Sequence, residues 1–94
     1  MTRRLHLWDE AELDVVDAVA WYEEQRDGLG AEFLMELDAV MSRVGETALQ
    51  FPEIRDGVRR ALLHRFPYSV YFKVGDEMVE VVAILHNHRH SRAA

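Results

Sequence analysis

The residues with the clearest chemical potential lie at the end of the chain, in the stretch VVAILHNHRHSRAA. An apolar run ends at Leu85, and His86, His88, Arg89 and His90 follow within five residues. In an extended segment the three histidines would share one face, within reach of a zinc-like ion. No aspartate or glutamate lies near them in the sequence, so we expect no functional metal site and no cofactor. The segment is then a catalytic cluster, a cationic tail for an acidic partner, or a solvated terminus.

The charge of the chain is unevenly placed. The net charge is -6 at pH 7, but residues 1–53 carry thirteen acidic against four basic side chains, whereas residues 54–94 carry seven basic against four acidic ones. Four of the five histidines also lie in the second half. This asymmetry favours a cationic face in the C-terminal half, directed at phosphate or at an acidic partner. The acids of the first half could simply decorate exposed helix faces.

Length and composition limit the architecture. With 94 residues, 49% hydrophobic and 30% charged, the chain is expected to form one globular domain over residues 1–94. No apolar run approaches the roughly 20 residues that a membrane span needs, and the N-terminus lacks a signal-peptide core. There are no cysteines, which leaves no disulfide framework and no thiolate metal site. We therefore expect a soluble, cytoplasmic protein.

The first half of the chain predicts a short strand and then a helical hairpin. Residues 3–8 alternate weakly, which is typical of an edge strand. Asp9 and Glu12 form a capping-box pattern at the start of a helix over residues 10–26, and Gly28 can take the left-handed position that ends it in a Schellman motif. The apolar residues at helical spacing in this helix are Leu13, Val16, Val19 and Ala20.

A second helix is expected over residues 30–47, and Pro52 ends the helical region. The link DGLG is so short that the two helices must be antiparallel neighbours. Residues 51–57 are expected to be a loop with a turn at Asp56 and Gly57. The apolar stripe of the second helix is Phe33, Leu37, Val40, Met41 and Val44.

The hydrophobic period changes after Gly57, and three strands are expected over residues 58–66, 68–74 and 78–86. The last strand is apolar on both faces, which is typical of a strand in the interior of a sheet. Simple alternation places its side chains in two sets, Val79, Val81, Ala83 and Leu85 on one face and Val82 and Ile84 on the other.

The element order is therefore β-α-α-β-β-β, an α+β fold with a helical hairpin packed on one face of a small, mainly antiparallel sheet. The other face needs a cover. Arg59 and Arg60 straddle a strand, so one of them faces the helices and needs a carboxylate; we expect Arg60 on the open face. Trp21 and Tyr22 are neighbours on the first helix, so one should face the sheet and the other its rim.

Ordered motifs run along almost the whole chain, from about residue 8 to residue 90. They are WYEEQ…GLG…F, G-x-R-R, FPY-x-V-Y and LH-x-x-R, and they occur in this order at family-like spacing. Together they resemble the RelE/ParE superfamily, the toxins of bacterial type II toxin–antitoxin pairs. The fold of that family is the one reached above from periodicity and turns.

The resemblance implies a protein partner and one of two activities. RelE-like members cut mRNA on the ribosome and ParE-like members inhibit DNA gyrase, and both are held inactive by an antitoxin whose helix or strand wraps the toxin. An antitoxin would supply the cover that the sheet needs, although the chain's own termini or a homodimer could also do so. The residues expected to contact the antitoxin are Trp21, Tyr22, Tyr71, Val82 and Ile84.

A RelE-like nuclease would need a base, an acid and cations around a phosphate, and His64, His86 and Arg89 are the candidates. The match to that branch is poor where it matters. Ser69 stands where the branch has an arginine, the preceding strand holds no lysine, and no aromatic residue closes the chain. The acidic net charge also opposes the approach to ribosomal RNA.

The ParE-like branch fits better, because the H-x-x-R ending that His86 and Arg89 supply is common there and inhibition works by binding rather than catalysis. We therefore predict a ParE-like toxin that binds DNA gyrase and is neutralised by a cognate antitoxin, and that assembles as a homodimer or as a toxin–antitoxin hetero-oligomer. A ribosome-dependent mRNA interferase and a non-toxic, partner-binding remnant of the family are the alternatives. The residues expected to contact the target are Arg60, Arg65, His86, His88 and Arg89.

Overall fold

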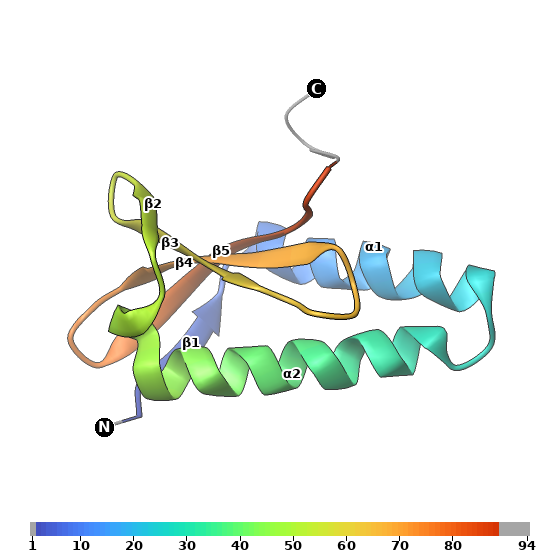
Figure 1. The fold of residues 1–94 in the computed structure, drawn as a ribbon, viewed down its shortest axis with the longest axis horizontal. Coiled ribbons are helices and arrows are strands. Elements are labelled where there is room, and N and C mark those ends of the chain that lie inside the picture. The colour runs from blue at the N-terminus through green and yellow to red at the C-terminus, as the bar shows by residue number, and fades with distance from the viewer. Residues whose placement is uncertain (1, 89–94) are drawn as a thin grey trace.

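The computed structural model describes residues 2–88. Five strands form one sheet in the order β1-β5-β4-β3-β2, in which β1 runs parallel to β5 and all other neighbours are antiparallel. The predicted α+β fold is confirmed, with β1 at an edge and β5 in the interior (Figure 1). In chain order the elements are β1 (Arg4–Leu7), α1 (Asp9–Gln25), α2 (Leu29–Thr47), the 3-10 helix η1 (Ala48–Gln50), β2 (Glu53–Arg55), β3 (Val58–Leu62), β4 (Tyr68–Val74) and β5 (Met78–His86).

The core lies between the helical hairpin and one face of the sheet (Figure 1). The predicted stripe of α2 is confirmed, since four of its five residues are buried and Met41 packs against them. Among residues 2–88, no helix is both long enough and apolar enough to cross a lipid bilayer. The buried core residues of the α-helices are Ala11, Ala18, Tyr22, Phe33, Leu37, Val40 and Val44, and those of the sheet are Ala61, Tyr68, Val70, Phe72, Val79, Val81 and Ile84.

The first helix is where predicted but buries a different face. Leu13 and Val16, members of the predicted stripe, are 62% and 61% exposed. The side that meets the sheet instead carries Ala11, Ala18 and Tyr22, all buried. Two alanines on this side let α1 approach the strands closely, and the larger aliphatic side chains are left outside.

The start of α1 also differs from the prediction. Trp8 is the N-cap residue, because its backbone N–H donates to the carbonyl oxygen of Val81 at 2.9 Å and keeps it extended. Asp9 is therefore the first helical residue, and no side chain caps the helix, so the predicted capping box of Asp9 and Glu12 is wrong. Both acids still lie in the first turn, where the helix dipole favours them.

The turn between the helices uses Gly28 in a different role. Its positive φ of 89° agrees with the predicted left-handed conformation, but it caps the start of α2, and Arg26 ends α1 in an extended conformation. The predicted Schellman ending at Gly28 is wrong for this reason. The Glu23 carboxylate accepts hydrogen bonds from the N–H groups of Gly28 and Gly30, at 2.9 and 3.0 Å, and so satisfies amides that α2 leaves free.

The predicted loop over residues 51–57 contains a further strand, β2, which pairs with β3 through a tight turn. Asp56 and Gly57 both have positive φ, 51° and 81°, the combination that two-residue hairpin turns require. At its other end β3 stops at Leu62, four residues before the predicted end. The chain leaves the sheet there because the carboxylate of Glu36 on α2 accepts the backbone N–H groups of the residues at 64 and 65.

A β-bulge interrupts β5. Tyr71 of β4 pairs with Ala83, but the next residue, Phe72, pairs with Val81, which leaves Val82 as an extra residue on β5. One extra residue moves every following side chain to the other face of the sheet. The strict alternation predicted along β5 is therefore wrong beyond Val81.

The bulge turns Ile84 into the core. Ile84 is 1% exposed and packs under the helices, rather than sharing a face with Val82 as predicted. Leu85, predicted on the face of Val79 and Val81, lies on the opposite one and is half-buried. The carboxylate of Asp14 on α1, itself 8% exposed, accepts a hydrogen bond from the backbone N–H of Ile84 at 2.9 Å. A buried acid thus holds the strand just after the bulge.

Replacing Asp14 with alanine is expected to lower the free energy of unfolding by about 1–3 kcal/mol, because the buried N–H of Ile84 would lose its acceptor. Asp14→Asn keeps an amide oxygen and should recover part of the loss. Asp17→Ala, at an exposed acid on the same helix, is the control and should change stability by less than about 0.5 kcal/mol. Urea denaturation followed by circular dichroism measures all three. Equal losses for Asp14→Ala and Asp17→Ala would contradict this role.

Candidate functional site

The face of the sheet that the helices leave free carries three rows of paired side chains. Val70 and Phe72 of β4 point into the core, so Ser69, Tyr71 and Lys73 point to the helix-free face. Within residues 2–88 no helix covers this face (Figure 1). Across β3, β4 and β5 the rows are Leu62, Ser69 and Leu85; Arg60, Tyr71 and Ala83; and Val58, Lys73 and Glu80, continued on β1 by His6.

Apolar side chains gather at the β2 side of this face. Leu62 is 49% and Ile54 47% exposed, whereas Tyr71 and Leu85 are half-buried. A hollow of about 590 Å³ opens between Ile54, Tyr71 and Leu85. Large apolar side chains around a hollow are typical of a surface that receives an anchoring side chain of a partner. The hollow is lined by Ile54, Arg55, Asp56, Val58, Tyr71 and Leu85.

Arg59 and Arg60 lie on opposite faces, as predicted. Arg59 faces the helices, where its Nη1 atom donates to the carbonyl oxygen of Phe51 at 2.6 Å and to that of Leu49 at 3.4 Å. The carboxylate expected for it is therefore wrong, since backbone carbonyls at the end of η1 take its place. Arg60 pairs with Tyr71 on the helix-free face. A predicted target-binding residue and a predicted antitoxin-binding residue are thus direct neighbours.

The other residues predicted to contact the antitoxin are divided between surface and core. Trp21 is 43% exposed and packs edge-on against Tyr22, with ring centroids 5.1 Å apart. Tyr22 is 8% exposed and stacks on Phe33 at 5.3 Å, so it is the member of the pair that faces the core. Ile84 is buried beneath the helices and Val82 is half-buried at the bulge. Of the five, Trp21, Val82 and Tyr71 therefore lie at or near the surface, whereas Tyr22 and Ile84 are buried in the core. Contact of these residues with an antitoxin stays a prediction.

The loop between β3 and β4 carries His64 and Arg65, and α2 holds both. The carboxylate of Glu36 accepts the backbone N–H groups of His64 and Arg65. The Arg65 guanidinium lies 2.7 Å from the carboxylate of Glu32, which also pairs with Arg26 at 3.2 Å. Hydrogen bonds from Arg65 and then Arg26 hold the pKa of Glu32 below its usual range. Arg65 is exposed but already engaged within the chain.

The two described histidines at the end of β5 lie side by side, with the ring centroids of His86 and His88 5.9 Å apart. The ring of His86 lies edge-on to Tyr68, 5.3 Å between centroids, and its Nδ1 atom accepts the backbone N–H of His88 at 3.0 Å. His88 is exposed, and the predicted residues Arg89 and His90 lie outside the described residues. Between residues 2 and 88, no three histidine, aspartate or glutamate side chains are placed to hold a metal ion.

Ser69 occupies the position at which the RelE branch carries an arginine. It is fully buried, and its hydroxyl donates to the side-chain oxygen of Asn87. The backbone N–H of Asn87 donates in turn to the carbonyl oxygen of Pro67 at 2.7 Å, so the end of β5 folds over this position. A phosphate could not reach a side chain here.

At the β1 edge of the helix-free face, two side chains share the carboxylate of Glu80. The Nδ1 atom of His6 lies 2.8 Å from Oε1 of Glu80, and the indole N–H of Trp8 donates to the same oxygen at 3.2 Å. The hydrogen bond and charge of Glu80 raise the pKa of His6, and the hydrogen bond from His6 lowers the pKa of Glu80. Glu80 is thus engaged by His6 and Trp8, and Arg60 and Lys73 are basic side chains of the same face.

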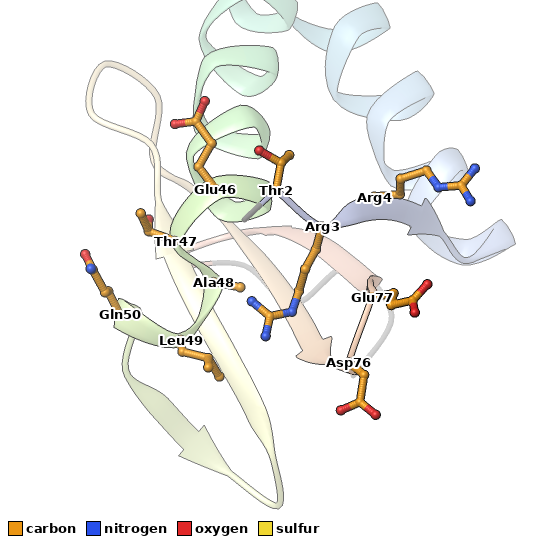
Figure 2. Close-up of a pocket in the computed structure, with 10 residues that line it drawn as sticks. All are labelled: Thr2, Arg3, Arg4, Glu46, Thr47, Ala48, Leu49, Gln50, Asp76 and Glu77. Atoms are coloured by element: carbon orange, nitrogen blue, oxygen red, sulfur yellow. The ribbon is translucent and has the colours of Figure 1, made fainter.

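A second hollow, of about 670 Å³, lies at the C-terminal end of α2 (Figure 2). The Arg3 side chain crosses it and donates from Nε to the carbonyl oxygen of Gly75 at 2.9 Å, which ties β1 to the turn between β4 and β5. None of the predicted site residues lies here, and its charges are of both signs, so we assign it a structural role. Its charged lining residues are Arg3, Arg4, Glu46, Asp76 and Glu77.

Three residues of the helix-free face were missed or misplaced by the sequence: Ile54, Leu62 and Leu85. The dipeptide Asp56-Gly57 is a strong hairpin signal and could have placed Ile54 in a strand. The alternation along residues 58–66 does place Leu62 on the face of Arg60, as the structure shows, but Leu62 was not among the predicted contact residues. Leu85 had no such signal, because its face depends on the bulge.

Comparison with known proteins supports one family. No protein-family model matches the chain. Toxin ParE2 of Mycobacterium tuberculosis, from strains CDC 1551 / Oshkosh and H37Rv, is 28% identical over 87 residues, which cover 92% of this chain and 83% of the relative. A chain of the chromosomal ParDE toxin–antitoxin system of Pseudomonas aeruginosa has the same fold, with a TM-score of 0.80, 19% identity, and coverage of 90% of this chain and 96% of that one.

The chain shares with the ParDE chain the fold of a helical hairpin on a five-stranded sheet. The similarity to the ParE2 toxins extends over most of its length. These findings support a protein of the RelE/ParE toxin family.

The His6 and Glu80 pair gives the helix-free face a measurable pH dependence. A raised pKa of His6 means that its contribution to stability is present below its unfolded pKa and is lost as the pH rises through its folded pKa. We expect His6→Gln to lower the melting temperature relative to the wild type at about pH 6 but not at about pH 9. Thermal melts at the two pH values measure the difference. If the melting temperatures of His6→Gln and the wild type differ by the same amount at about pH 6 and about pH 9, the pair of His6 and Glu80 contributes no pH-dependent stability.

Proposed function

We propose that this chain is the toxin of a type II toxin–antitoxin pair that arrests growth by binding DNA gyrase and is neutralised by a cognate antitoxin. The observation that carries the proposal is the helix-free face, which combines exposed apolar side chains with two cations. The ParE2 relatives and the P. aeruginosa ParDE structure support the toxin class. The antitoxin supplies the missing layer over the sheet.

The chemistry of the face defines the antitoxin segment that would cover it. An aliphatic or aromatic side chain would fill the hollow between Ile54, Tyr71 and Leu85. A carboxylate beside it would pair with Arg60 or Lys73. An acidic segment with an apolar anchor therefore fits this surface better than a basic one.

Neutralisation then follows because the surface for the antitoxin overlaps the surface for the target. Arg60, the target-binding candidate on this face, is the cross-strand neighbour of Tyr71. An antitoxin that packs on Tyr71 would also cover Arg60 and would exclude the target from it. His86, His88 and Arg89 extend the target-binding set at the end of β5.

Binding rather than catalysis is supported by the surroundings of the nuclease candidates. Ser69 is buried where an arginine would be needed, and the backbone of His64 is held on α2 by Glu36. His86 already packs on Tyr68. These contacts leave no base, acid and cation gathered around one open position among residues 2–88.

Expression of the toxin alone in bacteria, followed by assays of gyrase supercoiling and of mRNA integrity during translation, tests the proposal. Growth arrest with blocked supercoiling is the expected result. Codon-phased mRNA cleavage would replace it with a ribosome-dependent nuclease. Absence of growth arrest would identify a non-toxic partner-binding remnant.

Tyr71→Ala is expected to raise the dissociation constant for the antitoxin by about 30- to 300-fold, because it removes the largest side chain of the hollow. Met35→Gln, at a side chain that is 73% exposed on α2, is the matched control and should leave affinity unchanged. Isothermal titration calorimetry with the purified antitoxin measures both. Equal affinities for the two variants would show that the antitoxin binds elsewhere.

A further inference from the structure

The outward face of α1 carries an apolar stripe that the fold does not use. Leu13 and Val16 are 62% and 61% exposed, and Ala20 is exposed on the next turn. The spacing i, i+3, i+7 places the three on one side of the helix, away from the buried Ala18 and Tyr22. Trp21, 43% exposed, lies on a flank of this stripe.

The same helix is strongly acidic. Its sequence DEAELDVVDAVAWYEEQ holds seven acids and no lysine, arginine or histidine. Asp14 is buried against β5 and Glu23 caps α2. The other five form no ion pair with another residue of the described part of the chain. These exposed acids are Asp9, Glu10, Glu12, Asp17 and Glu24.

Helix stability explains only part of this pattern. Acids in the first turn interact favourably with the helix dipole, but Glu24 lies in the last turn, where a carboxylate is unfavourable and no basic residue compensates. Val16 is β-branched and exposed, so it lowers helix propensity without filling the core. The outward stripe and the acids at Asp17 and Glu24 therefore do not stabilise the isolated chain.

We propose that this outward face of α1 is a second docking surface, and that it binds a basic amphipathic helix of the antitoxin. The proposal rests on the proposed function above. Leucine-like side chains of the antitoxin helix would pack on Leu13, Val16 and Ala20, and its lysine or arginine residues would pair with Asp17 and Glu24.

Charge complementarity selects this occupant over others. A second copy of the chain would bring an equally acidic α1 against the first, and the two would repel each other. Nucleic acids and anionic lipid surfaces are negatively charged as well. A cationic protein segment gains from both the stripe and the acids.

The two docking surfaces require antitoxin segments of opposite charge. The helix-free face of the sheet presents Arg60 and Lys73 and fits an acidic segment, whereas α1 fits a basic one. The two surfaces lie on opposite sides of the layered fold (Figure 1). An antitoxin that uses both must therefore pass around the edge of the toxin, with a change in the sign of its charge along its length.

The double variant Leu13→Gln with Val16→Gln tests the stripe. Titration calorimetry with the purified antitoxin should show a dissociation constant raised by about 10- to 100-fold. The melting temperature of the free toxin should not fall, because both side chains are exposed. Met35→Gln is again the control, since it removes an exposed apolar side chain from the other helix.

A charge variant, Asp17→Asn with Glu24→Gln, tests the acids. Its affinity should be about 5- to 20-fold lower than that of the wild type at low salt, and the difference should largely vanish at about 1 M salt, where the Debye length is about 3 Å. An unchanged dissociation constant in both double variants, with Tyr71→Ala still weakened, would overturn the second surface and leave the proposed function intact. Failure of the wild-type protein to bind the antitoxin would overturn both the second docking surface and the proposed function.

Discussion

One helical hairpin can cover only one side of a five-stranded sheet, and the rest of this protein follows from that constraint. The apolar content of β2, β3, β4 and β5 exceeds what α1 and α2 can bury, so Ile54, Leu62, Tyr71 and Leu85 remain on a face without a second layer. A chain of this size has no spare elements among its described residues to roof that face. A partner that adds the missing layer gains the burial that the isolated toxin forgoes.

The bulge in β5 determines what that partner meets. Without it, Leu85 would lie under the helices and Ile84 would be exposed. The hydrogen bond from the N–H of Ile84 to Asp14 links α1 to β5 just after the bulge, where the alternation of side chains between the two faces of the sheet is reversed. A single buried carboxylate in the first helix thus influences the composition of a binding surface on the far side of the sheet.

Charge is separated between the two layers. The helices carry most of the acids, and two of these, Glu32 and Glu36, are used internally to hold the loop of Arg65. The sheet keeps Arg60 and Lys73 on its open face. A protein with surfaces of opposite sign can distinguish partners by charge as well as by shape.

The sequence alone determined the two helices, four of the five strands of the sheet and the place of β1 and β5 within it, because these depend on local periodicity and on which residues are apolar. It also placed Arg60 on the open face, since a strand alternates strictly until something interrupts it. The tertiary structure decided the rest. Leu13 and Val16 face outward because close approach to the sheet selected the small Ala11 and Ala18, and Ile84 faces inward because Asp14, seventy residues earlier in the chain, meets the backbone just beyond the bulge. Such choices depend on contacts between distant segments, which no local pattern contains.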